Sequence, residues 1–194
     1  MNQLRVAVIG AGSFGRHHVR VIKEMPDIEL TAIVDPNVEA SHKNLEDVIG
    51  RIDAAIIATP TVTHESIATQ LLESGIDVLV EKPIAETSEG AERLARLAQK
   101  NGRILQAGHL ERFNPAVTAL EKALTIPLFF EVHRLSVFTP RSLDIDVVLD
   151  LMIHDLDIVL SFVGAMPEEI RAAGISVLSS KVDIAKVRLA IATG

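Results

Sequence analysis

The segment LRVAVIGAGSFG, at residues 4–15, constrains the fold of this chain more than any other part of its sequence. An apolar strand enters a G-x-G-x-x-G turn, and a helix-like segment (16–25) follows it. In such a turn the first glycine allows the tight bend, the second lets the main chain approach a pyrophosphate, and the third lets the helix pack on the strand. The pyrophosphate lies at the helix N-terminus, where unpaired N–H groups and the helix dipole favour an anion. We therefore assign cofactor binding to Gly10, Gly12, Ser13, Phe14 and Gly15.

An acidic residue follows the second predicted strand, at the position where dinucleotide-binding folds carry one. Residues 28–34 (IELTAIV) predict a second strand that ends at Asp35, twenty residues after Gly15. A carboxylate there accepts hydrogen bonds from the adenosine ribose hydroxyls and repels a 2′-phosphate, so we expect NAD, with NADP disfavoured. Lys43 or His42 could soften that preference. A glycine turn in an ordinary βα unit is the competing interpretation, and the strand, the helix and the acid all disfavour it.

Composition excludes several classes of function. The chain has 194 residues and 48% hydrophobic residues, which fits one folded domain, or one domain and part of a second. Its net charge of −7 disfavours nucleic acid as a partner. No apolar run is long enough for a membrane span, and the N-terminus enters a strand directly, so we expect a cytoplasmic protein with no membrane partner. The lack of cysteine removes disulfides and thiolate chemistry, and the lack of tyrosine removes the short-chain dehydrogenase mechanism.

Alternating strand-like and helix-like segments predict an α/β fold, a Rossmann doubly wound parallel sheet, over residues 1–124. After the first two strands, we expect strands at 54–58, 77–80 and 103–107 and helices at 63–74 and 87–101. The pattern changes after residue 124. Residues 125–194 predict a partial α/β domain with an open, mainly antiparallel sheet, with strands at 127–138, 170–178 and 182–192 and a helix at 142–162.

Residues that can carry chemistry follow the carboxyl ends of the predicted strands, where ligands of an open parallel sheet bind. Lys82, fixed by the following proline, can point into that crevice and donate to a substrate oxygen on which negative charge develops. A solvated loop lysine is the alternative. His109 can contact a substrate at the same edge. With the cofactor we group the acid and the other residues at or just after these strand ends, which are Asp35, Thr59, Pro60, His64, Glu81 and Lys82.

A second group of polar residues lies in the otherwise apolar segment VLDLMIHDLD. Asp150 and His154 are four residues apart, so on a helix they share a face, and Asp157 lies near the same stripe. A carboxylate that orients or charges an imidazole is the usual support for a general base near neutral pH. A metal site is the alternative, but no second cluster of ligands is evident, so we expect no metal.

These pieces together resemble the Gfo/Idh/MocA (glucose–fructose oxidoreductase / inositol dehydrogenase) family. The matching motifs are GAGSFG, the Asp35-Pro36 pair, the Ala58-Thr59-Pro60 turn, Glu81-Lys82-Pro83 and D-x-x-x-H-x-x-D at 150–157. The resemblance implies a dinucleotide-binding domain, an α/β domain whose open sheet often mediates oligomers, and hydride transfer between nicotinamide and a sugar or cyclitol alcohol. It also implies that Lys82 and His154 are the catalytic pair, with Asp150 beside them.

Within the family, GHLERFNPAV and LMIHDLDIVL are similar to a branch of nucleotide-sugar 3-dehydrogenases, which oxidise the 3-hydroxyl of substrates such as UDP-N-acetylglucosamine. Arg112, Arg134 and Arg141 are then available for a diphosphate. The chain stops at Gly194, where the family's second sheet continues, so we expect either a truncated form or a homo-oligomer that completes the sheet. Two alternatives stay open: a glycoside hydrolase that keeps NAD bound, and a non-catalytic NAD-binding regulator.

Overall fold

The computed structural model describes residues 3–38, 40–125, 127–137 and 145–191. The chain forms two compact units, one that ends at Gly108 and one that starts at His109. The domain limit after residue 124 therefore stays a prediction, because it marks a change of sequence pattern and not a division in packing. The first unit holds a parallel sheet and the second a separate two-stranded antiparallel sheet.

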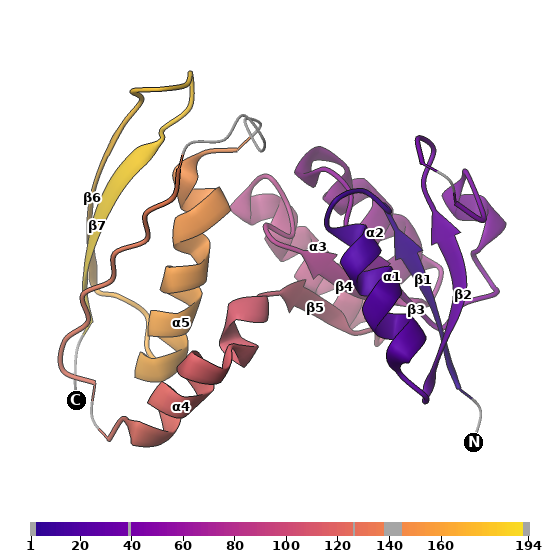
Figure 1. Ribbon diagram of the computed structural model, residues 1–194, viewed down its shortest axis with the longest axis horizontal. Coiled ribbons are helices and arrows are strands. Elements are labelled where there is room, and N and C mark those ends of the chain that lie inside the picture. Colours follow the sequence, from indigo (N-terminus) through magenta and orange to yellow (C-terminus); the bar gives the residue numbers. More distant parts are fainter. Residues whose placement is uncertain (1–2, 39, 126, 138–144, 192–194) are drawn as a thin grey trace. The chain divides into compact units, whose positions relative to one another are not determined.

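The sheet of the first unit has five parallel strands in the order β2-β1-β3-β4-β5 (Figure 1). From β1 the chain moves outward to β2 and then crosses to β3 on the other side of β1. This reversal of strand order is the switch point at which a doubly wound sheet opens a crevice beyond its carboxyl ends. The five strands confirm the predicted fold class, and their bounds are β1 (Leu4–Ile9), β2 (Ile28–Val34), β3 (Ala54–Ile57), β4 (Asp77–Glu81) and β5 (Leu105–Gly108).

Helices cover both faces of this sheet (Figure 1). On one face α1 (Gly15–Glu24) packs Ile22 against Val6 and Val8 of β1. On the other face α2 (His64–Glu73) and α3 (Ser88–Asn101) form the larger core with alternate residues of the same strands. Because consecutive side chains of a strand point to opposite faces, strands buried on both faces read as continuous apolar runs. Between β2 and β3 the described residues form only a 3-10 turn (Leu45–Asp47), so no helix covers that crossover.

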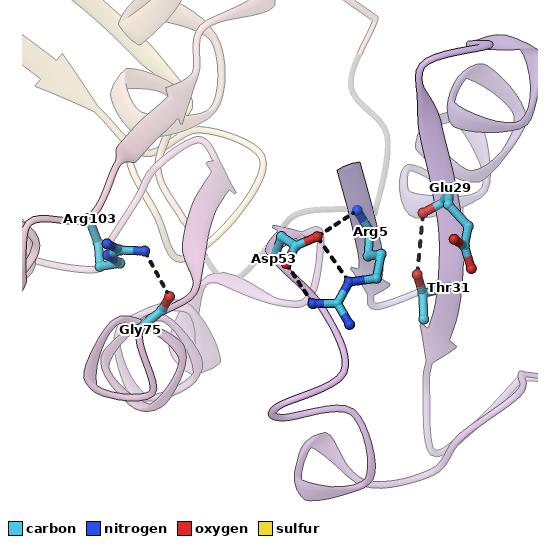
Figure 2. A network of polar contacts seen from close by, with 6 residues as sticks. All are labelled: Arg5, Glu29, Thr31, Asp53, Gly75 and Arg103. Atoms are coloured by element: carbon cyan, nitrogen blue, oxygen red, sulfur yellow. Dashed lines mark hydrogen bonds and ion pairs between the residues drawn. The ribbon is translucent and has the colours of Figure 1, made fainter. Parts of the chain in front are cut away.

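An ion pair fastens the amino-terminal edge of the sheet, away from the candidate site (Figure 2). Arg5 of β1 and Asp53, just before β3, form bonds of 2.6 and 3.0 Å between the guanidinium and the carboxylate. The side-chain hydrogen bond from Arg5, its main-chain N–H and its charge together lower the pKa of Asp53 to about 2. Arg103 donates to the Gly75 carbonyl at 3.1 Å, which joins the turn before β4 to the turn before β5.

The second unit begins with a 3-10 turn (Leu110–Phe113) and α4 (Pro115–Ala123), whose first turn is capped by the Asn114 side chain. A π-helical turn, η4 (Val148–Met152), runs directly into α5 (Ile153–Val163), so the predicted helix at 142–162 is broken into two geometries. Residues 142–144 lie outside the described residues. The hairpin of β6 (Glu169–Ile175) and β7 (Ile184–Ala190) confirms the antiparallel sheet.

The strand predicted at 127–138 is wrong for residues 127–137, which form no strand, while Phe138 lies outside the described residues. The alternation of apolar and polar residues resembles that of a strand, but a strand also needs a neighbour to pair its N–H and C=O groups. No described strand pairs with this segment. Side chains tie it to α5 instead: Phe130 stacks on Phe162 at 6.1 Å between ring centres, and Arg134 pairs with Asp155.

Candidate active site

The three glycines of the glycine-rich turn differ in the space beside them. Gly10 has a φ of 86°, and a Cβ there would lie 2.7 Å from the Ala58 carbonyl oxygen. A Cβ on Gly15 would collide with the Gly10 carbonyl oxygen, which confirms the close approach of α1 to β1. A Cβ on Gly12 would meet nothing within 4 Å. The protein therefore fills the space beside the first and third glycines and leaves open the space beside the second, where a ligand can approach the main chain.

The start of α1 offers hydrogen-bond donors to an anion. Among the residues that the structure describes, the main-chain N–H groups of Gly12, Ser13 and Phe14 have no acceptor. Phe14 is 48% exposed, and its ring meets the rings of His17 and His18 edge-on, at 6.3 and 5.8 Å between centres. Open N–H groups at a helix N-terminus suit a phosphate. The loop thus fits the diphosphate of a dinucleotide on the basis of its own geometry.

Asp35 lies at the carboxyl end of β2 and is only 7% exposed. Its Oδ2 accepts from the Ala11 N–H at 2.8 Å, and its Oδ1 accepts from the N–H groups of Asn37 (2.8 Å) and Val38 (3.2 Å). Burial alone would raise the pKa of Asp35, but these three bonds and the charge of Lys43 outweigh it and lower the pKa below its usual value. A fixed negative charge therefore lies beside the glycine-rich turn.

Lys43 and His42, the two residues that could weaken the preference for NAD over NADP, form hydrogen bonds within their own loop. The Lys43 ammonium donates to the carbonyl oxygens of Asp35 at 3.2 Å and Val38 at 2.6 Å. The Nδ1 atom of His42 lies 2.9 Å from the Ser41 hydroxyl. Lys43 thus binds the carbonyl groups of the loop that follows Asp35, and its charge contributes to the lowered pKa of Asp35.

The Glu81-Lys82-Pro83 segment leaves β4 at the same edge of the sheet. Glu81 is buried, and its Oε1 lies 2.7 Å from Nε2 of His18 on α1. Its other oxygen lies over β5, where a Cβ on Gly108 would come within 2.9 Å. Lys82 follows directly and is half-buried, and the Lys82–Pro83 bond is cis. The acid before Lys82 is therefore enclosed by a neighbouring helix and a neighbouring strand.

His64 lies between the loops that follow β3 and β4. Its side chain is 1% exposed, with Nδ1 2.8 Å from the Pro83 carbonyl oxygen and Nε2 2.8 Å from the Thr59 carbonyl oxygen. The Thr59 hydroxyl accepts from the Thr63 hydroxyl at 2.7 Å. The structure thus brings Thr59, Pro60 and His64 together, but the His64 ring contacts protein carbonyl groups, so its assignment to the cofactor stays a prediction.

In the second unit, two of the arginines predicted for a substrate diphosphate are paired with carboxylates of α5. Arg112 donates to Asp157 at 2.6 and 2.5 Å, and Arg134 donates to Asp155 at 2.7 to 3.0 Å. The two carboxylate side chains are only 10% and 13% exposed. His109 lies 3.9 Å from Asp157 through Nε2, and its Nδ1 is buried with no described partner. A substrate role for Arg112, Arg134 and His109 stays a prediction, and Arg141 lies outside the described residues.

Asp150 and His154 lie on either side of the junction between η4 and α5. Asp150 belongs to the π-helical turn, and His154 is the second residue of α5; both are half-buried. A π-helical turn next to a helix is a frequent feature of functional sites. Within the described ranges, no group of three or more His, Cys, Asp or Glu side chains could hold a metal ion.

Sequence reasoning missed the His18–Glu81 pair and the burial of His64. The pair joins residues 63 positions apart, and no spacing rule connects a residue on the first helix with the end of the fourth strand. The available signals were weak: a histidine one turn after the glycine loop, and a histidine just after the Thr59-Pro60 turn. Both are also common at protein surfaces.

Comparison with known proteins identifies relatives over the whole chain. The family described as "Oxidoreductase family, NAD-binding Rossmann fold" (GFO_IDH_MocA) matches residues 4–109. UDP-N-acetylglucosamine 3-dehydrogenase from Acidithiobacillus ferrooxidans is 35% identical over all of this chain and 65% of its own length. A solved structure of that enzyme, GnnA, has a TM-score of 0.90 and covers 98% of this chain and 66% of the solved chain.

A more distant structure shares the fold. GenD2 from gentamicin A biosynthesis, solved in complex with NAD, has a TM-score of 0.86 at 24% identity and covers 98% of this chain and 64% of that one. The chain spans 65% of the length of the UDP-N-acetylglucosamine 3-dehydrogenase described above. None of the helices that the structure describes is long and apolar enough to cross a membrane.

Proposed function

Because this chain belongs to the GFO_IDH_MocA oxidoreductase family, with its NAD-binding Rossmann fold, we propose that it is an NAD-dependent dehydrogenase of a sugar alcohol group. The observation that carries the proposal is the Asp35 carboxylate, buried beside a glycine-rich turn whose second glycine faces open space. The dinucleotide, when bound, supplies the nicotinamide that accepts or returns a hydride. The chain's own residues would bind it through the N–H groups at the start of α1 and the Asp35 carboxylate.

The cofactor we propose is NAD rather than NADP. A 2′-phosphate would bring a second negative charge close to Asp35, whose lowered pKa keeps it ionised. Lys43 already donates to two carbonyl oxygens of the loop. Titrating the protein with NADH and NADPH tests this: we expect tighter binding of NADH by about tenfold or more, or about 1.4 kcal/mol. Equal affinity for both would contradict the proposed role of Asp35.

We propose that Lys82 donates to the substrate hydroxyl oxygen and stabilises the negative charge that develops there, while His154 accepts the hydroxyl proton. Asp150, four residues before His154, would orient the imidazole and favour its charged form. The acid and base roles of Lys82 and His154 are interchangeable in principle, and the pH dependence of kcat assigns them. Replacing the base should abolish the acidic limb of that profile.

The substrate we propose is a nucleotide sugar, with the 3-hydroxyl of UDP-N-acetylglucosamine as the first candidate. The 35% identity to UDP-N-acetylglucosamine 3-dehydrogenase supports it. Arg112 uses its Nε and Nη2 atoms on Asp157, and its side chain is 50% exposed. A guanidinium has five N–H donors, so those of Nη1 are left for a phosphate oxygen.

The test follows NADH formation at 340 nm with UDP-N-acetylglucosamine, free N-acetylglucosamine and inositol. We expect turnover with the nucleotide sugar and a loss of about 10²-fold or more in K82M and H154N. K100M and H133N are matched controls, because both side chains are exposed and neither residue is assigned to the candidate site. Wild-type turnover in K82M and H154N would refute the mechanism. NAD binding without turnover of any sugar would favour the alternative of a non-catalytic NAD-binding regulator. Cleavage of a glycoside without net formation of NADH would favour the alternative of a glycoside hydrolase that keeps NAD bound.

We also propose that the second unit packs against another copy of the chain. Leu128, Phe129, Leu135 and Val137 are 81% to 91% exposed, and no described residue of this unit beyond Gly108 is fully buried. Large apolar side chains left this exposed are expected where a chain associates with another surface. Native mass spectrometry tests the proposal: we expect a dimer or larger, and a monomer at micromolar concentration would refute it.

A further inference from the structure

We propose that His18 and His64 are positioning residues that hold the two chain neighbours of Lys82 from opposite faces of the sheet. The inference rests on the proposed function, in which the Lys82 ammonium must reach a substrate oxygen. His18 belongs to α1 and His64 to α2, and these helices pack on opposite faces of the parallel sheet. Each histidine reaches the segment that leaves β4, although neither is near it in sequence.

On the first face, His18 holds Glu81. Its Nε2 lies 2.7 Å from the Glu81 carboxylate, and the two side chains are only 14% and 10% exposed. A carboxylate removed from water needs hydrogen-bond donors, so loss of this imidazole would leave the neighbour of Lys82 poorly paired. The His18 ring also meets Phe14 edge-on, at 5.8 Å between centres. The glycine-rich loop and the Lys82 segment are thus joined through one side chain.

On the second face, His64 holds Pro83. Its Nδ1 and Nε2 atoms each lie 2.8 Å from a carbonyl oxygen, that of Pro83 and that of Thr59 respectively. A carbonyl oxygen can only accept, and a neutral imidazole carries one N–H, so such a ring donates to one of these two oxygens at a time. At 1% exposure water does not compete for either contact. His64 therefore links the loop after β3 to the loop after β4.

Lys82 thus lies between two neighbours that are fixed by different helices. A lysine ammonium is a point charge on a flexible four-carbon stem, so its position depends strongly on where its main chain is held. A displacement of about 1 Å at a reacting group can reduce the rate by about 10²-fold. We therefore expect loss of either contact to lower kcat while changing KM little, because Lys82 makes one of several proposed substrate contacts and its bond matters most as charge develops on the oxygen.

Matched substitutions separate each contact from general damage to the fold. The side-chain nitrogen of glutamine takes the position of a histidine Nε2, and that of asparagine takes the position of Nδ1. H18Q therefore retains a donor for Glu81, whereas H18F retains a ring without one. H64N retains a donor at the position that faces Pro83 and none at that facing Thr59, whereas H64Q does the reverse. H17Q, at the exposed neighbour of His18 on α1, is the control.

The experiment measures deuterium uptake of the peptide that contains Lys82 in the chain without ligand, together with kcat and KM. H18F and H64Q should raise uptake in that peptide alone and lower kcat about tenfold or more, with KM changed less than about threefold. H18Q and H17Q should stay near wild type in both uptake and kcat, and H64N should keep the uptake of that peptide near wild type. Unchanged uptake in H18F and H64Q, equal behaviour of H64N and H64Q, or faster exchange throughout the chain would each overturn the inference.

Two outcomes keep this inference separate from the proposed function. If the wild-type chain turns over no sugar with NAD, the proposed function fails, and the uptake data still decide whether the two histidines hold the Lys82 segment. If the His64 variants do not fold, the comparison of H18F with H18Q decides whether His18 holds Glu81, and equal uptake in those two variants overturns the inference.

Discussion

Replacing Gly12 with alanine separates cofactor binding from folding more cleanly than any other change in the glycine-rich loop. The added Cβ would meet no protein atom within 4 Å, and the backbone of Gly12 is not in the left-handed region. The variant should therefore fold normally and gain about 0.4–1 kcal/mol in unfolding free energy, because alanine restricts the unfolded chain. If a diphosphate approaches the main chain there, the methyl group intrudes on it, and NADH affinity should fall about tenfold or more, equivalent to about 1.4 kcal/mol.

G15A provides the contrasting outcome, because its Cβ would collide with the Gly10 carbonyl oxygen and separate α1 from β1. We expect that variant to lose both stability and binding. Unfolding by urea is followed by circular dichroism. Binding is followed by the fluorescence of NADH, since the chain has no tryptophan or tyrosine to interfere. Wild-type NADH affinity in G12A would refute our placement of the diphosphate, and a large loss of stability in G12A would refute the geometry of the loop.

Three further predictions concern the fold. L94A removes a fully buried side chain of α3 and should lower the unfolding free energy by about 2–5 kcal/mol in a urea titration. T87A removes the hydroxyl that accepts from the Gly90 N–H and should lower it by about 0.5–2 kcal/mol, whereas T87S should restore it. D53N removes a carboxylate whose pKa is about 2 in the folded chain and about 4 when unfolded, so it should destabilise the protein above pH about 4. As the pH falls from about 4 to about 2, thermal unfolding of D53N and wild type should converge, and a constant difference would contradict the role of the ion pair.

The sequence predicts the first unit well because its signals are local and agree with one another. Apolar runs, the capping threonine at position 87 and the terminal Gly102 fix strands and helices without knowledge of distant partners. The second unit is different. Residues 127–137 have the pattern of a strand, but whether they form one depends on a neighbour that local pattern does not encode. The π-helical geometry of η4 is also not predictable from the sequence, because its apolar and acidic residues follow the same pattern as those of an ordinary α-helix.

For the candidate site, the sequence identifies residues better than it identifies their partners. The carboxyl-end rule places Asp35 and Glu81 at one edge of the sheet, and the structure agrees. The rule does not predict the pairing of Glu81 with His18, because that contact depends on how α1 lies across the sheet. His64 is buried, and the position of its ring nitrogens links it to Lys82 through Pro83.

The arginines of the second unit show why a charge cannot be assigned to a ligand from its sign alone. Arg112 was grouped with a substrate diphosphate and Asp157 with the His154 stripe, yet the two form a bidentate pair. Loss of activity in R112M could therefore come from a lost phosphate contact or from an unpaired Asp157. A double-mutant cycle decides between them: if Arg112 acts only through Asp157, R112M/D157N should be no worse than R112M, with coupling of about 0.5–3 kcal/mol. If Arg112 binds substrate, R112M should raise KM for a nucleotide sugar much more than for the free sugar, and the double variant should retain that difference.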